Sequence, residues 1–171
     1  MARRKTIYVS STFEDLKAHR AALKAELERA GYDVESMERY AAFPEPPLDK
    51  CLSDVAASDA YVLVLAHRYG FVPVVRGAKD KSITELEYWH AVDGKKPVFV
   101  FCIDENHPWP PKSVDKGKAA RQLAELRAVV EGAHGRRTFT GPDDLTKQVL
   151  AALSAYAWPG SVAGVDSAGA A

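Results

Sequence analysis

Runs of apolar residues alternate along the chain with stretches in which apolar residues recur at helical spacing. Residues 60–66 are apolar throughout, and residues 97–103 form a second run of the same kind. Continuous apolar runs of this length are typical of central parallel strands that are buried on both faces. A shorter run at 7–9 and weaker patterns at 32–37 and 136–140 predict three further strands.

Helical spacing predicts a helix after each of these strands. Five alternations of strand and helix indicate right-handed crossovers and a parallel sheet with helices on both faces. The expected fold is α/β, a five-stranded parallel flavodoxin-like three-layer sandwich with strand order 2-1-3-4-5. The helices are expected over 13–30, from 47 or 48 through 55, from 82 or 84 to about 94, over 116–131, and from a cap at 141–144 through 156.

One domain is predicted, over residues 1–158. The chain has 171 residues, the size of a single domain, and its hydrophobic content of 47% is ordinary for a globular protein. Residues 39–47 contain three prolines and are expected to form a loop. Residues 159–171 are mostly small, and we expect a disordered tail or a truncated linker there.

Charge and composition exclude several classes of function. Basic and acidic residues both number 23, so the formal net charge is zero and the basic excess of a nucleic-acid-binding protein is missing. No segment approaches the length of a membrane span or of a signal peptide. Cys51 and Cys102 lie in apolar patterns without zinc-ligand spacing. Two buried, reduced thiols in a cytoplasmic protein are therefore expected.

Motifs of the common catalytic classes do not occur in the sequence. It contains no phosphate-binding loop, no dinucleotide-binding glycine motif, no zinc-protease motif and no nucleophile elbow. The five histidines are scattered, and none is spaced as a metal ligand beside Asp, Glu or Cys. We therefore expect neither a metal site nor a serine hydrolase.

A turn rich in hydroxyl groups follows the first strand. It contains Ser10, Ser11 and Thr12, and Ser11 is expected to be the N-cap of the next helix, with Glu14 completing a capping box. Such a turn gathers hydroxyls and free helix N–H groups where open α/β sheets bind ligands, and it suits a phosphate or a ribose. A well-capped first helix without any ligand explains the same residues, so both interpretations remain open.

Two further segments are expected at the same edge of the sheet. In the loop 67–70, Arg68 could contact a phosphate or pair with a nearby acid. The helix beginning near residue 82 contains Glu85 and Glu87, each three residues after a hydroxyl, so at least one of them is expected to close a capping box. Glu87 is expected to face the sheet, where a carboxylate could contact a ribose or stabilise an oxocarbenium ion during N-glycosidic cleavage.

Four motifs between residues 5 and 103 resemble, in preserved order, the TIR-like family catalogued as domain of unknown function 4062. In that family the domain is usually the N-terminal module of larger defence or signalling proteins with STAND-type NTPase or repeat domains. The motifs are YVSSTFEDL at 8–16, RYG at 68–70, SITELEY at 82–88 and GKKPV at 94–98.

The resemblance implies kinship with TIR domains and nucleoside deoxyribosyltransferases, which use a glutamate at the start of the third helix on glycosidic bonds. It places Glu87 at that position, with Glu85 in reserve. It implies NAD or a related nucleotide as ligand or substrate, no required cofactor, and self-association or C-terminal domains as partners. A non-catalytic recognition or self-association module is the alternative. The nucleotide-binding residues it implies are Ser10, Ser11, Thr12, Arg68, Tyr69 and Gly70.

Overall fold

A single parallel sheet lies at the centre of the fold. The computed structural model describes residues 3–36, 47–76 and 78–160, and within them five strands are ordered β2-β1-β3-β4-β5. All four neighbouring pairs are parallel. The predicted strand order is therefore confirmed. The strands are β1 (Thr6–Ser10), β2 (Asp33–Ser36), β3 (Ala60–Leu65), β4 (Val98–Ile103) and β5 (Thr138–Phe139).

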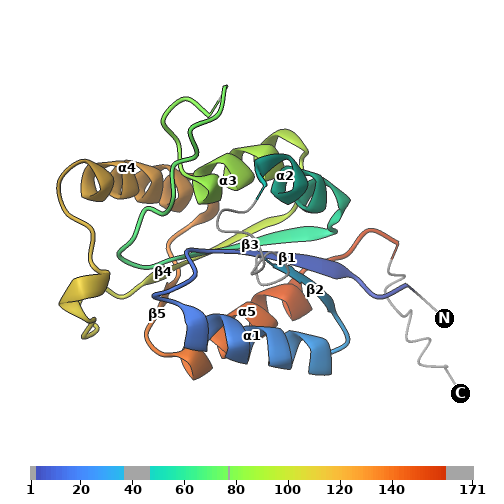
Figure 1. The fold of residues 1–171 in the computed structure, drawn as a ribbon. Coiled ribbons are helices and arrows are strands. Elements are labelled where there is room, and N and C mark those ends of the chain that lie inside the picture. Colours follow the sequence, from blue (N-terminus) through green and yellow to red (C-terminus); the bar gives the residue numbers. More distant parts are fainter. Residues whose placement is uncertain (1–2, 37–46, 77, 161–171) are drawn as a thin grey trace, which may run out of the picture.

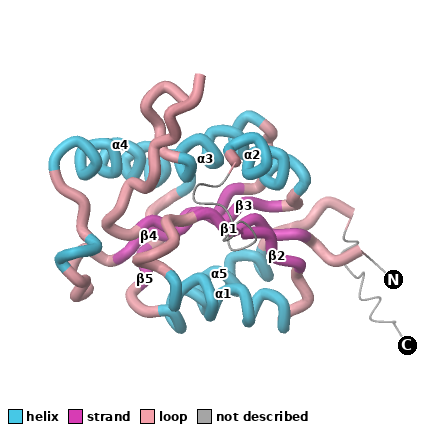
Figure 2. Tube along the Cα trace, in the orientation of Figure 1, coloured by secondary structure: helices cyan, strands magenta, loops and turns pink. Residues whose placement is uncertain are grey.

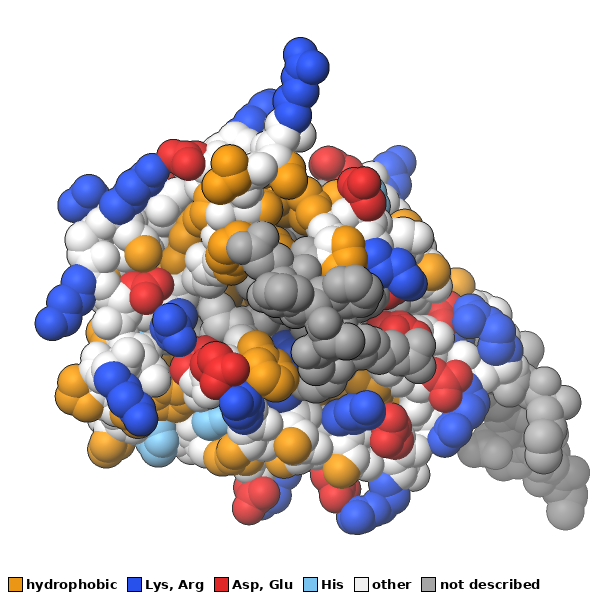
Figure 3. All heavy atoms as spheres, viewed as in Figure 1, with side chains coloured by type: hydrophobic (Ala, Val, Ile, Leu, Met, Phe, Trp, Pro, Cys, Tyr) orange, Lys and Arg blue, Asp and Glu red, His pale blue; other side chains and the backbone are white. Residues whose placement is uncertain are grey.

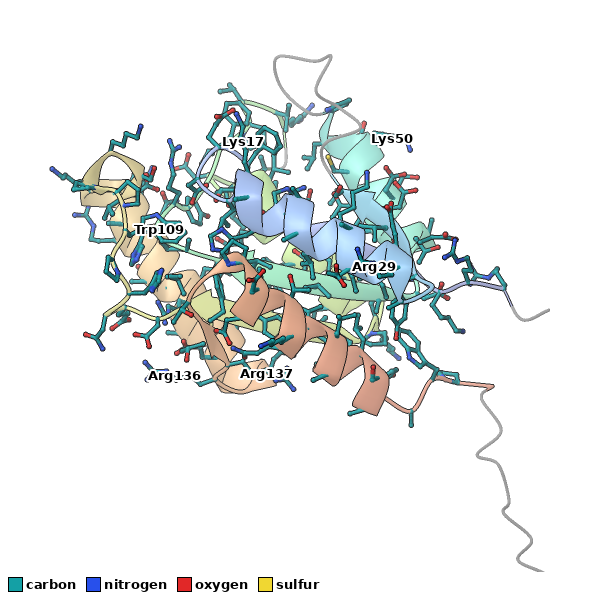
Figure 4. The ribbon with its side chains drawn as sticks, turned by 90° about the horizontal axis from the view of Figure 1, so that it is seen from below. Lys17, Arg29, Lys50, Trp109, Arg136 and Arg137 are labelled. Atoms are coloured by element: carbon teal, nitrogen blue, oxygen red, sulfur yellow. The ribbon has the colours of Figure 1, made fainter. Side chains whose placement is uncertain are left out.

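Helices cover both faces of this sheet, as Figures 1 and 2 show. In those views α2, α3 and α4 lie above it and α1 and α5 lie below it. Seen from below, α1 and α5 run side by side (Figure 4). The predicted three-layer sandwich is thus confirmed. The helices are α1 (Lys17–Arg29), α2 (Leu48–Ala57), α3 (Ile83–Asp93), α4 (Gly117–His134) and α5 (Pro142–Ala155), with a 3-10 turn at Pro111–Ser113.

The two-residue period of a strand decides which side chains meet which helical layer. All six residues of β3 are buried because helices cover both faces of the sheet at this central strand. In β1, Ile7 and Val9 pack into the cluster below the sheet, and Tyr8 packs into the cluster above it. The same alternation turns Ser10 towards the layer that contains α3.

Helix α1 begins four residues later than predicted. Its N-cap is Leu16, without a side-chain cap bond. The hydroxyl of Ser11 accepts a hydrogen bond from Arg20 at 2.6 Å and donates to the carbonyl of Thr12 at 2.6 Å. Because that hydroxyl is committed to these partners, the predicted capping box of Ser11 and Glu14 is wrong.

Other boundaries differ by a few residues. Helix α4 extends to His134, three residues further than expected, and β5 is shorter than the predicted strand because only its two residues pair with β4. Most of the predicted loop 39–47, and the tail from residue 161, lie outside the described residues. Cys51 and Cys102 are buried and free, as expected. Among the described helices, none is long and apolar enough to cross a membrane.

Candidate functional site

Three segments converge at the carboxyl edge of the sheet, which lies to the left in Figure 1. They are the turn after β1, the loop after β3 and the start of α3, as the sequence predicted. Gly70 lies between them with φ +99°, and a Cβ atom there would be 3.2 Å from Thr12 Cγ2 and 3.6 Å from Thr84 Oγ1. This glycine therefore allows a close approach that a larger residue would prevent.

Alanine at position 70 is expected to destabilise the fold by about 2–3 kcal/mol. The left-handed backbone costs an L-residue about 1–2 kcal/mol, and the tight contact with Thr12 adds to this cost. Gly31→Ala is the matched control, because Gly31 has φ +94° and no atom within 4 Å of the added Cβ. Urea unfolding should show a clearly larger loss for Gly70→Ala. Equal losses would mean that the contact with Thr12 relaxes without cost.

Glu87 is the most completely enclosed carboxylate of this edge, with an exposed fraction of 0%. The hydroxyl of Tyr8 donates to its Oε1 at 2.8 Å, and the hydroxyl of Ser10 donates to its Oε2 at 2.5 Å. The thiol of Cys51 is also in hydrogen-bonding contact with it, and Arg20 is close enough to act on its charge. Both oxygens of the predicted catalytic carboxylate are thus held in fixed directions by protein donors.

Burial governs the acidity of this group. Removal from water raises the pKa of Glu87 above its usual value, and the opposing effects of the Ser10 and Tyr8 hydroxyls and of Arg20 are smaller. Burial also raises the pKa of Cys51 to about 12, so that side chain stays a neutral thiol at physiological pH. A neutral thiol and two hydroxyls solvate the carboxylate.

The free energy of unfolding should therefore depend on pH through Glu87. Between the ordinary carboxyl pKa and the raised one, the folded state binds more protons than the unfolded state, so stability falls as pH rises. Each unit by which the pKa in the folded state exceeds that in the unfolded state lowers the free energy of unfolding by about 1.4 kcal/mol once the group is ionised. Glu87→Gln removes this loss. Urea unfolding should show that the free energy of unfolding of Glu87→Gln increases relative to that of the wild type from pH 4 to pH 8. A gap that does not change with pH would contradict the raised pKa.

Ser11 and Thr12 form hydrogen bonds with partners other than Glu87. Arg20 is buried and donates to Ser11 Oγ, and Thr12 donates to Asp15 Oδ1 at 2.6 Å. Of the predicted nucleotide-binding hydroxyls, only Ser10 therefore bonds to the predicted catalytic carboxylate. The other two organise the entry into α1.

Glu85 belongs to a separate network. Its carboxylate accepts hydrogen bonds from Tyr69, from Lys81 at 2.5 Å and from Trp89 at 3.1 Å. These donors lower its pKa despite the opposing effect of burial, which is the largest single one. Ser82 is the N-cap of α3 and accepts from the Glu85 N–H at 3.2 Å, which is half of the predicted capping box. The Tyr69 hydroxyl supplies the other half by accepting from the Ser82 N–H.

Arg68 points to a different partner. It is partly exposed, and its Nε lies 3.8 Å from Asp115 Oδ1, while the same carboxylate accepts from the Tyr69 N–H at 2.7 Å. Between the two roles that the sequence left open, this geometry favours pairing with an acid. The six predicted binding residues are thus brought to one edge but divided among several networks.

Besides Cys51, whose thiol contacts Glu87, the sequence analysis missed Tyr8 as a residue of this site. Its hydroxyl is one of the two that hold Glu87. The signal was the two-residue period of β1, which places Tyr8 and Ser10 on the same face of the sheet. Within the described residues, no group of three or more His, Cys, Asp or Glu side chains could hold a metal ion.

Comparison with known proteins places the chain in a family. The family model described as Domain of unknown function (DUF4062) matches residues 6–154, which include every predicted site residue. No curated protein matches the chain.

Proposed function

The chain belongs to the family described as Domain of unknown function (DUF4062), and from its sheet edge we propose a TIR-like nucleotide-binding domain in which Glu87 acts on the N-glycosidic bond of NAD or a related nucleotide when domains assemble. The observation that carries this proposal is the burial of a carboxylate at the carboxyl edge between β1 and β3. Open α/β sheets bind ligands at such a switch point.

The cost of burying Glu87 supports a functional role. A buried carboxylate held only to stabilise the fold would gain more from a full ion pair or from an apolar replacement. Here two hydroxyls orient it and burial raises its pKa, a combination that is common at functional sites.

The proposed chemistry needs one negative charge beside the ribose. The bond between C1′ and the nicotinamide nitrogen breaks, its electron pair neutralises the pyridinium, and nicotinamide leaves. The Glu87 carboxylate stabilises the oxocarbenium ion that remains, and water then adds to C1′ and releases a proton. Because Glu87 is fully buried in the single domain, contact with a ribose requires this edge to open. We assign that opening to assembly.

A non-catalytic recognition or self-association module is the second candidate. It is favoured by the occupation of both Glu87 oxygens by Tyr8 and Ser10, and by the pairing of Arg68 with Asp115 rather than with an open phosphate site.

Incubation of the purified protein with NAD tests the proposal. The protein is concentrated with a crowding agent to promote assembly, and released nicotinamide is followed by chromatography, with heat-denatured protein as the blank. Release above the blank supports the glycosidase. Nucleotide binding measured by calorimetry without release supports a recognition module. Absence of both leaves self-association as the function.

A further inference from the structure

A second cluster of polar side chains lies at the carboxyl edge of the sheet, apart from Glu87. It combines Asp15 and His19, at the start of α1, with His67 after β3 and Trp109 after β4. We name these four residues the Trp109 corner. The ring centroid of Trp109 lies 5.6 Å from that of His19 and 5.8 Å from that of His67. Figure 4 places Trp109 on the side where α1 and α5 begin, and Figure 3 shows histidine and hydrophobic side chains together at the left of the molecule, the side of this edge.

Three buried polar atoms of the corner have no hydrogen-bonding partner within the described residues. They are Asp15 Oδ2, His19 Nδ1 and Trp109 Nε1, and in the described part of the chain every such side-chain atom belongs to this corner. His19 is 8% exposed, so more than nine-tenths of it is shielded from water. Buried polar atoms are nearly always paired, because an unpaired one costs free energy. Their gathering at one place indicates a bound group.

The three atoms divide into two acceptors and one donor. The indole N–H of Trp109 only donates, and Asp15 Oδ2 is the carboxylate oxygen that remains after Thr12 donates to Oδ1 at 2.6 Å. His19 Nε2 lies 3.5 Å from the Thr140 carbonyl and carries the ring proton there, because a carbonyl only accepts. Burial lowers the pKa of His19, so its ring is neutral at physiological pH and Nδ1 accepts.

We propose that the Trp109 corner binds a planar group in which an amino group with two N–H donors stands next to an acceptor. The amino group donates to Asp15 and His19, and the acceptor receives the indole N–H of Trp109. The amino edge of adenine and the carboxamide of nicotinamide share this pattern. The rings of the corner supply flat surfaces for stacking. One water can meet the same three atoms, but only a planar group also uses these surfaces.

Entry of the group requires a movement of the Trp109 ring. The ring is partly exposed, and within the described residues its indole makes ring contacts but no hydrogen bond. The ends of its loop are fixed, since the Asp104 N–H donates to the Phe139 carbonyl at 2.8 Å and the Asp115 N–H donates to the His67 carbonyl at 2.9 Å. The ring therefore swings outward while the loop ends stay in place, and the planar group lies between the indole and α1.

This inference rests on the proposed function for its choice of nucleotide groups. Thr12 connects the two places, because it donates to Asp15 and its methyl group lies beside Gly70. The corner contains neither Glu87 nor its hydroxyl partners. Binding at the corner without nicotinamide release from NAD would contradict the glycosidase alone. Nicotinamide release that does not depend on Trp109 or Asp15 would contradict the corner alone.

Calorimetric titration of the full chain with two matched pairs of small molecules tests the chemistry. IMP carries a carbonyl oxygen where AMP carries the amino group, and nicotinate carries a carboxylate where nicotinamide carries the carboxamide. The corner should bind AMP or nicotinamide more tightly than its matched partner by about tenfold or more. Preference for AMP assigns adenine, and preference for nicotinamide assigns the carboxamide. Equal binding within both pairs, or no binding of any probe, would overturn the proposal.

Variants of the corner locate the binding. Trp109→Phe keeps an aromatic ring and removes the N–H donor. Asp15→Asn keeps an oxygen for Thr12 and puts an N–H donor in place of Oδ2. Each should weaken binding of the preferred probe by about tenfold. Trp158→Phe is the matched control, because it also loses an indole N–H but Trp158 packs against Tyr32 at the opposite edge of the sheet. Thermal unfolding checks that each variant is folded.

Nuclear magnetic resonance of the indole N–H groups provides a direct measurement. The Trp109 signal is identified by its loss in Trp109→Phe, and the Trp158 signal by its loss in Trp158→Phe. Addition of the preferred probe should shift the Trp109 signal and leave the Trp158 signal in place. An unmoved Trp109 signal, together with unchanged affinity of Trp109→Phe and Asp15→Asn, would place the probe elsewhere and overturn the proposal.

Discussion

Glu87→Gln is expected to reduce nicotinamide release by about a hundredfold or more. The glutamine keeps the size and the two polar positions of the side chain, so Tyr8 and Ser10 retain a partner. It removes the negative charge that would face the oxocarbenium ion. Loss of one such electrostatic contact typically lowers the rate by roughly 10²–10³-fold. Initial rates of nicotinamide release by wild type and variant, at equal degree of assembly, provide the measurement.

Two further variants make this result specific. Glu28→Gln removes an exposed carboxylate from α1 and should leave the rate unchanged. Glu85→Gln tests the reserve position, whose carboxylate is already paired with Lys81. If release survives in Glu87→Gln and is lost in Glu85→Gln, the chemistry belongs to the Glu85 network and the assignment of Glu87 is wrong.

Phe101→Ala is expected to lower the free energy of unfolding by about 3–5 kcal/mol. Phe101 is completely buried in β4 and packs into the cluster beneath the sheet. The guanidinium of Arg137 also lies over its ring, 5.6 Å from the centroid. Truncation removes apolar area and leaves a cavity between the sheet and the helices, where relaxation is limited by close packing. Urea unfolding at neutral pH gives the difference directly.

The same substitution at an exposed phenylalanine provides the comparison. Phe71→Ala should cost clearly less, because Phe71 is 45% exposed and buries only part of its ring. The measurement belongs in dilute protein, since any self-association would raise the apparent stability of the wild type. A loss at Phe101 no larger than at Phe71 would mean that the cluster below the sheet repacks around the missing ring.

Regular periodicity made most of the fold predictable. The continuous apolar runs of β3 and β4 indicated central strands, and their burial follows from helices on both faces. The start of α1 was not predictable in the same way. Ser11 resembles an N-cap locally, but its hydroxyl is bound by Arg20, nine residues away, and α1 therefore starts after Leu16.

The candidate site, like the fold, was only partly predictable from the sequence. The position of Ser10 near Glu87 followed from the topology, since parallel strands end at one edge. The bond from Tyr69 to Glu85 and the pairing of Arg68 with Asp115 depend on the path of the loop after β3. No short-range spacing encodes that path. Residues 68 and 115 come together only when the chain has folded.

The loop between β3 and α3 has a closed base, which has a consequence for protein engineering. The Ile83 N–H donates to the Phe71 carbonyl at 2.9 Å, and the Ser82 N–H donates to the Tyr69 hydroxyl at 3.2 Å. The ends of this loop are therefore fixed by bonds that do not involve its tip. Because the entropy of closing a loop grows only slowly with its length, an inserted peptide should be tolerated there. The tip is thus a suitable place for a genetically encoded epitope or fluorescent reporter.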